Sequence, residues 1–162
     1  TVWGLGCDAT SIDAVAKIFK LKNRVESKSL VVLVSSIKML CSYVHKVPQK
    51  AIHIITTTKK PTTIIYNNPK GLAANAIASD NTIAIRIPSH DYCLELINKF
   101  GKPIISTSAN ISGESTPKSF SEISLPILEG VDYVVNLEQD KITDKSSTIL
   151  KIVGNDIEVI RA

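Results

Sequence analysis

Five consecutive apolar residues, Leu30 to Val34, constrain the fold of this chain more than any other segment. A strand that is apolar on both sides has to be covered on both faces of its sheet, so this run predicts a buried strand in a layered domain. Similar runs predict further strands at 63–66, 83–87, 104–106, 131–137, 148–153 and 157–161, the last two joined by a hairpin at Gly154-Asn155-Asp156.

Helical spacing of apolar residues separates these strands. Residues 11–21 place Ile12, Val15, Ile18 and Phe19 on one helical face, with Ser11 as a candidate N-cap. Further helices are predicted at 36–46, ended by Pro48, from Ser89 to Phe100, closed by Gly101, and after the capping box Ser119-x-x-Glu122. Helices and strands that mix without strict alternation predict an α/β (α+β) domain with a mixed sheet.

The composition excludes several classes of protein. The chain has 162 residues, enough for one domain with a sizeable core, and its 44% apolar content is too high for disorder. No apolar run approaches the roughly 18–20 residues that span a bilayer, so no membrane association is expected. Without linkers or repeats, we expect one domain over 1–162 that lacks a short N-terminal segment, because the chain opens without Met on what reads as the end of a strand.

Three widely spaced cysteines, Cys7, Cys41 and Cys93, form no CxxC pair, which argues against a disulfide framework or a zinc site. With no secretory segment at the start, a reducing, cytoplasmic location is expected. The three histidines share no metal-ligand spacing, so each is interpreted as structural or exposed and no protein-bound metal is predicted.

The charge is unevenly distributed along the chain. Residues 1–70 carry 11 Lys/Arg and 3 Asp/Glu (+8), whereas residues 71–162 carry 8 and 12 (−4). The basic half suggests a surface that meets an anion such as a nucleotide, a nucleic acid or a phosphate; a solubilising basic face is the alternative.

Polar segments at the ends of predicted elements are the candidates for chemistry. Lys22, Arg24 and Lys28 follow the first helix, where they would either clamp a phosphate chain or complement the helix dipole. Arg86 alternates with apolar neighbours on a strand and would suit a carboxylate ligand. Ser106 to Gly113 offers many neutral donors after a buried strand, whereas Ser146-Ser147-Thr148 is a weak signal. The patterns of a P-loop and of a nucleophile elbow are both absent.

Taken in order, these segments resemble the YrdC family of threonylcarbamoyl-AMP synthases. TVWGLGCDA is similar to the family's VYGLGxxA, LKNR to its KxR signature, and IAIRIPSH to VAVRxPxH. GKPIISTSANISGESTP resembles PIxxxSANxSGxxxP, SSTIL resembles PSTIV, and EVIRA resembles the start of LRxG. The resemblance covers nearly the whole chain and implies a YrdC-like domain, with a twisted mixed sheet flanked by helices around a concave central cavity.

The resemblance implies a nucleotidyltransferase that joins L-threonine, bicarbonate and ATP into L-threonylcarbamoyl-adenylate, releasing diphosphate, with Mg²⁺ bound to the ATP. The product would serve threonylcarbamoyl-adenosine modification of tRNA through a tRNA-modifying threonylcarbamoyl transferase complex. By motif position, the KxR and SxN signatures, Lys22, Arg24, Ser108 and Asn110, would be catalytic. ATP would contact Arg24, Lys28, Thr82, Ser108, Thr116 and Arg161, and threonine would contact Thr1, Arg86, Ser106 and Ser147.

Three departures from the family pattern concern the predicted site. Lys59-Lys60-Pro61 replaces a Pro-Gly-Pro loop, Leu33 stands where a His is frequent, and the family's PTE does not precede Val2. Two alternatives stay open. One is a non-enzymatic module that binds tRNA or other double-stranded RNA weakly through the basic half, although only 8 aromatic residues are present for base stacking. The other is a carbamoyl-adenylate domain of the kind found in hydrogenase maturation proteins.

Overall fold

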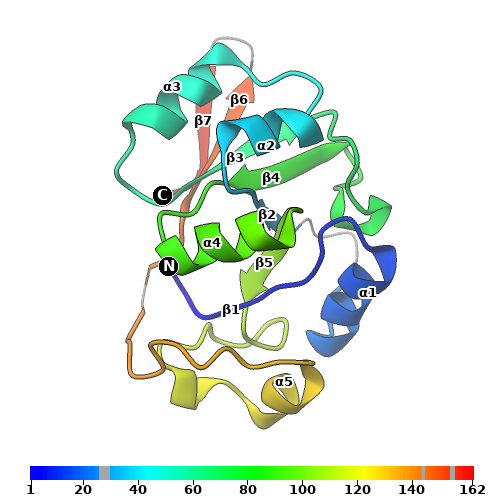
Figure 1. Ribbon diagram of the computed structural model, residues 1–162, viewed down its shortest axis with the longest axis vertical. Coiled ribbons are helices and arrows are strands. Elements are labelled where there is room, and N and C mark those ends of the chain that lie inside the picture. Colours follow the sequence, from blue (N-terminus) through cyan, green and yellow to red (C-terminus); the bar gives the residue numbers. More distant parts are fainter. Residues whose placement is uncertain (26–29, 144, 154–155) are drawn as a thin grey trace.

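The computed structural model describes residues 1–25, 30–143, 145–153 and 156–162. Within them the chain builds one open, seven-stranded sheet in the order β1-β5-β2-β4-β3-β6-β7 (Figure 1). The strands are β1 (Gly4–Leu5), β2 (Val31–Leu33), β3 (Thr62–Asn67), β4 (Thr82–Arg86), β5 (Ile104–Ser108), β6 (Thr148–Val153) and β7 (Asp156–Arg161). The pairs β2–β4 and β3–β6 are parallel and the others antiparallel, which confirms the predicted mixed sheet.

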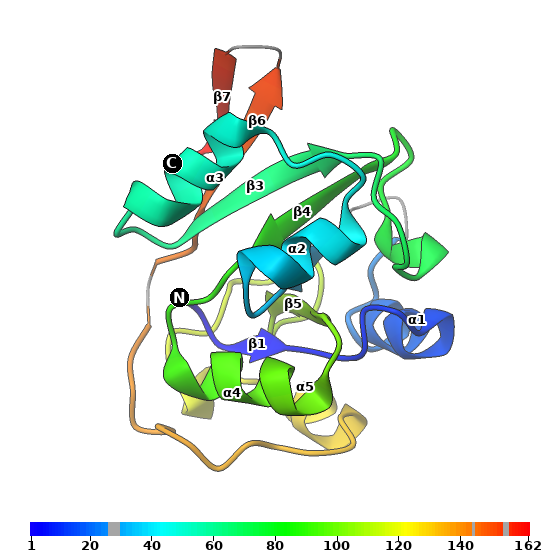
Figure 2. The same ribbon diagram turned by 45° about the horizontal axis from the view of Figure 1, so that its top comes forward.

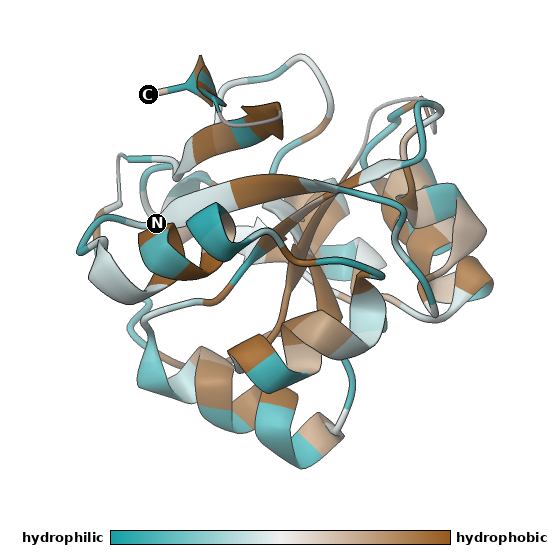
Figure 3. Cartoon of the chain, turned by 90° about the horizontal axis from the view of Figure 1, so that it is seen from above, coloured by the Kyte–Doolittle hydropathy of each residue, from teal (hydrophilic) through white to brown (hydrophobic). Residues whose placement is uncertain are grey.

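The helices pack against the sheet through a continuous cluster of buried apolar residues. They are α1 (Ile12–Leu21), α2 (Ile37–Tyr43), α3 (Gln49–Thr57), α4 (Asp91–Phe100) and α5 (Leu125–Gly130), with 3₁₀ turns at Ala74–Ala76 and Phe120–Glu122. Buried residues of α1, α2, α3 and α5 join one face of the strands in this cluster, represented by Phe19, Leu40, Ala51 and Ile127. Seen from above, the central strands are the most apolar part of the chain (Figure 3).

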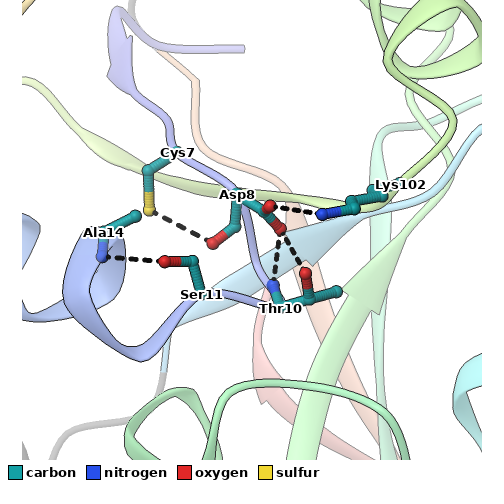
Figure 4. A network of polar contacts seen from close by, with 6 residues as sticks. All are labelled: Cys7, Asp8, Thr10, Ser11, Ala14 and Lys102. Atoms are coloured by element: carbon teal, nitrogen blue, oxygen red, sulfur yellow. Dashed lines mark hydrogen bonds and ion pairs between the residues drawn. The ribbon is translucent and has the colours of Figure 1, made fainter.

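The corner between β1 and α1 is fixed by Asp8. Its Oδ1 accepts hydrogen bonds from the Thr10 amide (2.8 Å) and hydroxyl (2.6 Å), and its Oδ2 pairs with Lys102 Nζ at 3.0 Å (Figure 4). Ser11 caps α1 by accepting from the Ala14 amide, as the sequence predicts. The contacts tie the entrance of α1 to the loop that begins β5, so the two elements that carry the KxR and SxN signatures share one anchor.

Gly6 continues this corner because β1 approaches β5 too closely for a side chain. A Cβ at Gly6 would lie 2.9 Å from the Ile105 carbonyl oxygen, a distance that a real Cβ does not tolerate. Gly6 is therefore required by a close backbone approach rather than by its backbone conformation.

The predicted strand at 131–137 is wrong. Residues 131–143, which we call the strap, have no regular secondary structure and run from α5 along one side of the molecule toward β6 (orange in Figures 1 and 2). Their apolar side chains suggested a strand, but these residues pair with no strand of the sheet, and Val135 and Leu137 instead line a cavity. The described part of the chain thus forms its open sheet from six longer strands and the two-residue β1.

Other boundaries differ in smaller ways. The sequence analysis missed α3 because Pro48 was interpreted only as a helix end, whereas it stands at the N-cap of α3. It also missed α5, which has a Pro in its first turn. The capping box at Ser119 forms a 3₁₀ turn, and Gly101 closes α4 in the left-handed conformation (φ 73°), as predicted. The predicted turn residues Gly154 and Asn155 lie outside the described residues.

Candidate active site

The register of the sheet places half of the predicted site residues on one face. Directly paired residues have side chains on the same face, and alternate residues along a strand share it. Val31 pairs with both Ala84 and Ser106, Leu33 pairs with Arg86, and Gly4 pairs with Ser108. Ile149, which follows Ser147 by two residues, pairs with Thr63 and Arg161. The face opposite the apolar cluster therefore carries Thr82, Arg86, Ser106, Ser108, Ser147 and Arg161.

A cavity of about 460 Å³ opens beside Arg86. We call it the Arg86 cavity; its walls are formed by residues 1–4, 58–62 and 86–90, by Ile55, Tyr92 and Cys93, and by Val135, Leu137, Glu138, Lys141 and Thr143 of the strap. Its volume falls within the range of about 300–1,000 Å³ that is usual for small-molecule sites. Thr1 and Arg86 are the two predicted threonine contacts that line it.

Arg86 is the cation best placed to meet a ligand there. Its Nε is buried and has no hydrogen-bond partner among the described residues. Burial lowers the pKa of Arg86, and the nearby Arg161 guanidinium adds to the effect, whereas Cys93 opposes it. A bidentate carboxylate or phosphate would stabilise a partly buried guanidinium of this kind most, because it offers two charge-assisted hydrogen bonds.

Ser147 and Arg161 form a braced pair on the same face. The Ser147 hydroxyl lies 2.8 Å from Thr63 Oγ1, and Arg161 donates to the Ser147 carbonyl from Nε (3.0 Å) and Nη2 (2.8 Å). These bonds join β3, β6 and β7 at one end of the sheet. Neither residue is among those lining the Arg86 cavity, so their contacts with threonine and ATP stay predictions.

Lys22 is held in a different environment, at the end of α1. Only 1% of its surface is exposed, and its Nζ donates to the carbonyl oxygens of Ser108 and Asn110. Its own carbonyl accepts from the Ser112 amide at 2.7 Å. Burial lowers the pKa of Lys22 to about 8, with the Arg24 charge as the second cause. Lys22 therefore fixes the loop that follows β5, and a direct contact with phosphate stays a prediction.

The SxN loop is braced from within as well. Asn110 Nδ2 donates to the carbonyls of Ile111 (3.0 Å) and Glu114 (2.8 Å), while Asn110 Oδ1 is buried without a hydrogen-bond partner in the described structure. Arg24 follows Lys22 by two residues but lines a separate shallow hollow of about 390 Å³ with Phe19, Lys20 and Asn23. Burial lowers the pKa of Arg24.

The remaining predicted residues are not gathered at the Arg86 cavity. Thr82 begins β4, at the opposite end from Arg86, and its hydroxyl donates to Asp80 Oδ1 at 2.6 Å. Thr116 is exposed, Ser106 lies half-buried on β5, and Lys28 lies outside the described residues. The structure thus brings Thr1 and Arg86 together in one place and Lys22, Ser108 and Asn110 in another.

The cavity also contains residues that the sequence analysis did not single out as functional. His90 Nε2 lies 3.2 Å from Glu138 Oε2, and Lys141 Nζ lies 3.0 Å from the same oxygen. Lys59 and Lys60, from the loop that departs from the family pattern, also line the Arg86 cavity. His90 stands in the sequence as the last residue of the segment that resembles VAVRxPxH, four residues after Arg86, whereas its partner Glu138 directly follows the segment predicted as a strand.

The walls of the cavity favour anions. Among the described lining residues, Lys59, Lys60, Arg86 and Lys141 are cationic, and Glu138 is the one carboxylate. In the parts of the chain that the structure describes, no three His, Cys, Asp or Glu side chains gather as a metal site. Nor does any helix there have the length and apolar character needed to cross a bilayer.

Comparison with known proteins identifies the family. The family model Sua5_yciO_yrdC, described as telomere recombination, matches residues 1–162. The chain belongs to the Sua5/YciO/YrdC family. It is 33% identical over 133 residues to the threonylcarbamoyl-AMP synthase of Hahella chejuensis, covering 82% of this chain and 72% of that protein. It is 34% identical over 126 residues to the synthase of Bacillus subtilis, covering 76% and 36%.

Solved structures of this family confirm the YrdC-like fold. P. abyssi Sua5 in complex with L-threonine matches 99% of this chain and 47% of its own, with a TM-score of 0.90 and 25% identity. E. coli YciO matches 98% and 77%, with a TM-score of 0.82 and 21% identity, a likeness that concerns the fold alone. The chain therefore spans about half the length of the archaeal Sua5.

Proposed function

We propose that this chain is a nucleotidyltransferase that makes L-threonylcarbamoyl-adenylate from L-threonine, bicarbonate and ATP and releases diphosphate. The observation that carries the proposal is the Arg86 guanidinium, which lines a cavity and has a buried Nε without a partner among the described residues. Support comes from the curated relatives named threonylcarbamoyl-AMP synthase and from the likeness to a Sua5 solved with L-threonine.

In this proposal the Arg86 cavity holds the amino acid. Arg86 takes its carboxylate through two parallel N–H···O bonds, the geometry that a guanidinium offers. Thr1 and the face that bears Ser106 and Ser147 supply neutral groups for the side-chain hydroxyl. The amine then forms a carbamate with bicarbonate, and the carbamate oxygen attacks the α-phosphorus of ATP.

The triphosphate needs cations and fixed donors rather than a protein nucleophile. Arg24 and the loop of Ser108 and Asn110 would orient the triphosphate. Lys22 fixes that loop through its hydrogen bonds to the two carbonyl oxygens. Mg²⁺ enters with the triphosphate as part of the substrate, keeping several of its waters. Catalysis rests on orientation of the two reactants and on preorganised positive charge.

The same proposal predicts where the product is used and by which partners. The product is an unstable mixed anhydride, so a tRNA-modifying threonylcarbamoyl transferase complex in the cytoplasm would consume it. Direct binding of tRNA by the basic half of the chain is a separate prediction; it requires binding at low salt that falls steeply as salt rises.

The deciding assay measures diphosphate release with one substrate omitted at a time. The proposal requires release only when threonine, bicarbonate and MgATP are all present, with serine and valine as matched amino-acid controls. Equal release without threonine, or with valine in its place, would contradict it. Mass spectrometry of the product distinguishes the threonylcarbamoyl adenylate from AMP.

A further inference from the structure

We infer that His90, oriented by Glu138, is the base that takes a proton from the amino group of threonine; the inference rests on the proposed function. Carbamate formation needs a neutral amine, whereas a free amino acid at neutral pH carries an ammonium. Some group near the bound amino acid therefore has to accept a proton before the N–C bond forms.

The walls of the Arg86 cavity leave few proton acceptors. Lysine, arginine and phenol side chains in general hold their protons at neutral pH. Burial, the largest cause, raises the pKa of the Cys93 thiol, which keeps it protonated although Arg86 acts in the opposite direction. Among the described side chains of the cavity, His90 and Glu138 remain as acceptors.

Between these two, the contacts assign the roles. Hydrogen bonds from Lys141 and then His90 hold the pKa of Glu138 below its usual range, which makes it a weak base and a lasting anion. An ionised carboxylate only accepts hydrogen bonds, so at 3.2 Å the His90 Nε2 must carry the hydrogen and donate it. The lone pair of His90 then lies on Nδ1, which no hydrogen bond within the described structure occupies.

The chain places this base at a fixed distance from the carboxylate clamp. Arg86 ends β4 and His90 precedes α4, so both ends of the connecting segment are set by secondary structure, and Pro88 restricts the backbone between them. Four residues reach at most about 14 Å between Cα atoms, and both side chains line the same cavity. In this inference, an amino acid whose carboxylate lies on Arg86 presents its amine to His90 within the same cavity.

The strap completes the arrangement from the opposite wall. Glu138 adopts a left-handed backbone conformation (φ 51°), which is strained for a residue with a side chain. Its carboxylate bridges Lys141 on the strap and His90 before α4. The charged groups that line the cavity with His90 are thus Glu138 and Lys141 on the strap, Arg86 on β4, Lys59 and Lys60 before β3, and the α-amino group of Thr1.

The step balances without an oxidant or a reductant. The Nδ1 of His90 takes one proton from the threonine ammonium, giving the neutral amine and an imidazolium. The amine nitrogen bonds to the carbon of bicarbonate while the C–OH bond breaks, and the hydroxyl leaves as water with the second amine proton. Carbamate and imidazolium remain, and the imidazolium returns its proton to solvent.

The experiment compares diphosphate release by the wild type, His90→Gln and Glu138→Gln from pH 5.5 to 9.5, with threonine varied and ATP and bicarbonate saturating. At neutral pH we expect His90→Gln to lower kcat about 100-fold, the low end of general-base effects, with the threonine KM changed less than about threefold. The deficit shrinks toward pH 9.5, where the amine loses its proton to water. The ratio of variant to wild type cancels the pH dependence of bicarbonate itself.

A second variant, Glu138→Gln, and a control variant at another histidine, His53→Gln, test the inference further. Without the carboxylate, His90 loses the hydrogen bond that orients its ring, so kcat falls, but less than in His90→Gln. His53→Gln, exposed on α3 and outside the cavity, keeps the wild-type profile. A His90→Gln variant with a wild-type kcat at all pH values, or with only a raised KM, overturns the inference. A wild-type protein that releases no threonine-dependent diphosphate instead overturns the proposed function, before any variant is made.

Discussion

Lys22 and Arg86 are both cations whose pKa is lowered chiefly by burial, yet they stand in opposite situations. Lys22 is enclosed, and its ammonium is shared between two carbonyl oxygens of the SxN loop. Arg86 faces a cavity, and its Nε has no partner among the described residues. A buried cation with partners holds the structure together, whereas one without them has its stabilising contact still to come from a ligand. Sequence motifs alone rank the two as equals.

The largest effect that tests this contrast is loss of threonine binding in Arg86→Gln. Two charge-assisted hydrogen bonds at about 1.5 kcal/mol each predict roughly a 100-fold weaker affinity in calorimetric titration. The free energy of unfolding in urea should not fall, because no partner in the described structure loses a bond. Arg86→Lys is the matched control, which keeps the charge but not the fork. Unchanged threonine affinity in Arg86→Gln would remove the cavity from the amino-acid site.

Lys22→Met should show the reverse pattern. Removing the ammonium leaves two carbonyl oxygens without their donor, so we expect the free energy of unfolding to drop by about 2–3 kcal/mol. The control is Lys20→Met, an exposed lysine in the last turn of the same helix, for which the change should stay within about 0.5 kcal/mol. If Lys22→Met instead keeps full stability and loses only ATP affinity, Lys22 is a phosphate ligand and the contrast fails.

The pH dependence of stability separates the two cations further. The pKa of Lys22 is about 8 in the fold and 10.5 as a free side chain, so between these values the unfolded chain binds more protons than the folded one. Stability contributed by Lys22 then rises with pH across this window. The difference in unfolding free energy between the wild type and Lys22→Met should therefore widen from pH 8 to pH 10. A difference that is constant or narrows over this range contradicts the buried environment.

The smallest effect is expected at Ser147, which resembles Lys22 in being committed to neighbours. Ser147→Ala removes the hydroxyl that meets Thr63 and should cost about 1 kcal/mol, while the carbonyl contact with Arg161 persists. Ser146→Ala changes an exposed neighbour and should be neutral. Denaturant unfolding of the two variants measures the difference; equal stabilities would show that the bond contributes nothing.

Local patterns predicted most of the strands and helices that bury apolar residues, because burial leaves a periodic trace in the sequence; α3 and α5 were the exceptions. The Leu30–Val34 run and the Gly101 cap are examples. The strap misled the analysis since its apolar residues line a cavity instead of pairing in the sheet. The motif resemblance located Arg86 and Lys22, but not their different surroundings. Partners of Lys22 lie 86 and 88 residues away and His90 lies 48 from Glu138, so nothing local encodes either contact.

These sequence separations also determine the order in which contacts can form while the chain is being synthesised. Ribosomes add roughly 5–20 residues per second, so Lys22 emerges several seconds before the Asn110 carbonyl, 88 residues further on, exists to receive it. The parallel pairing of β3 with β6 is delayed by about the same time. Until β6 is made, the edge of β3 that pairs with it stays open. A nascent chain stalled before Thr148 would hold β3 paired with β4 on one side, while its other edge would stay open until β6 is made. Such an open edge is a template for pairing with other chains.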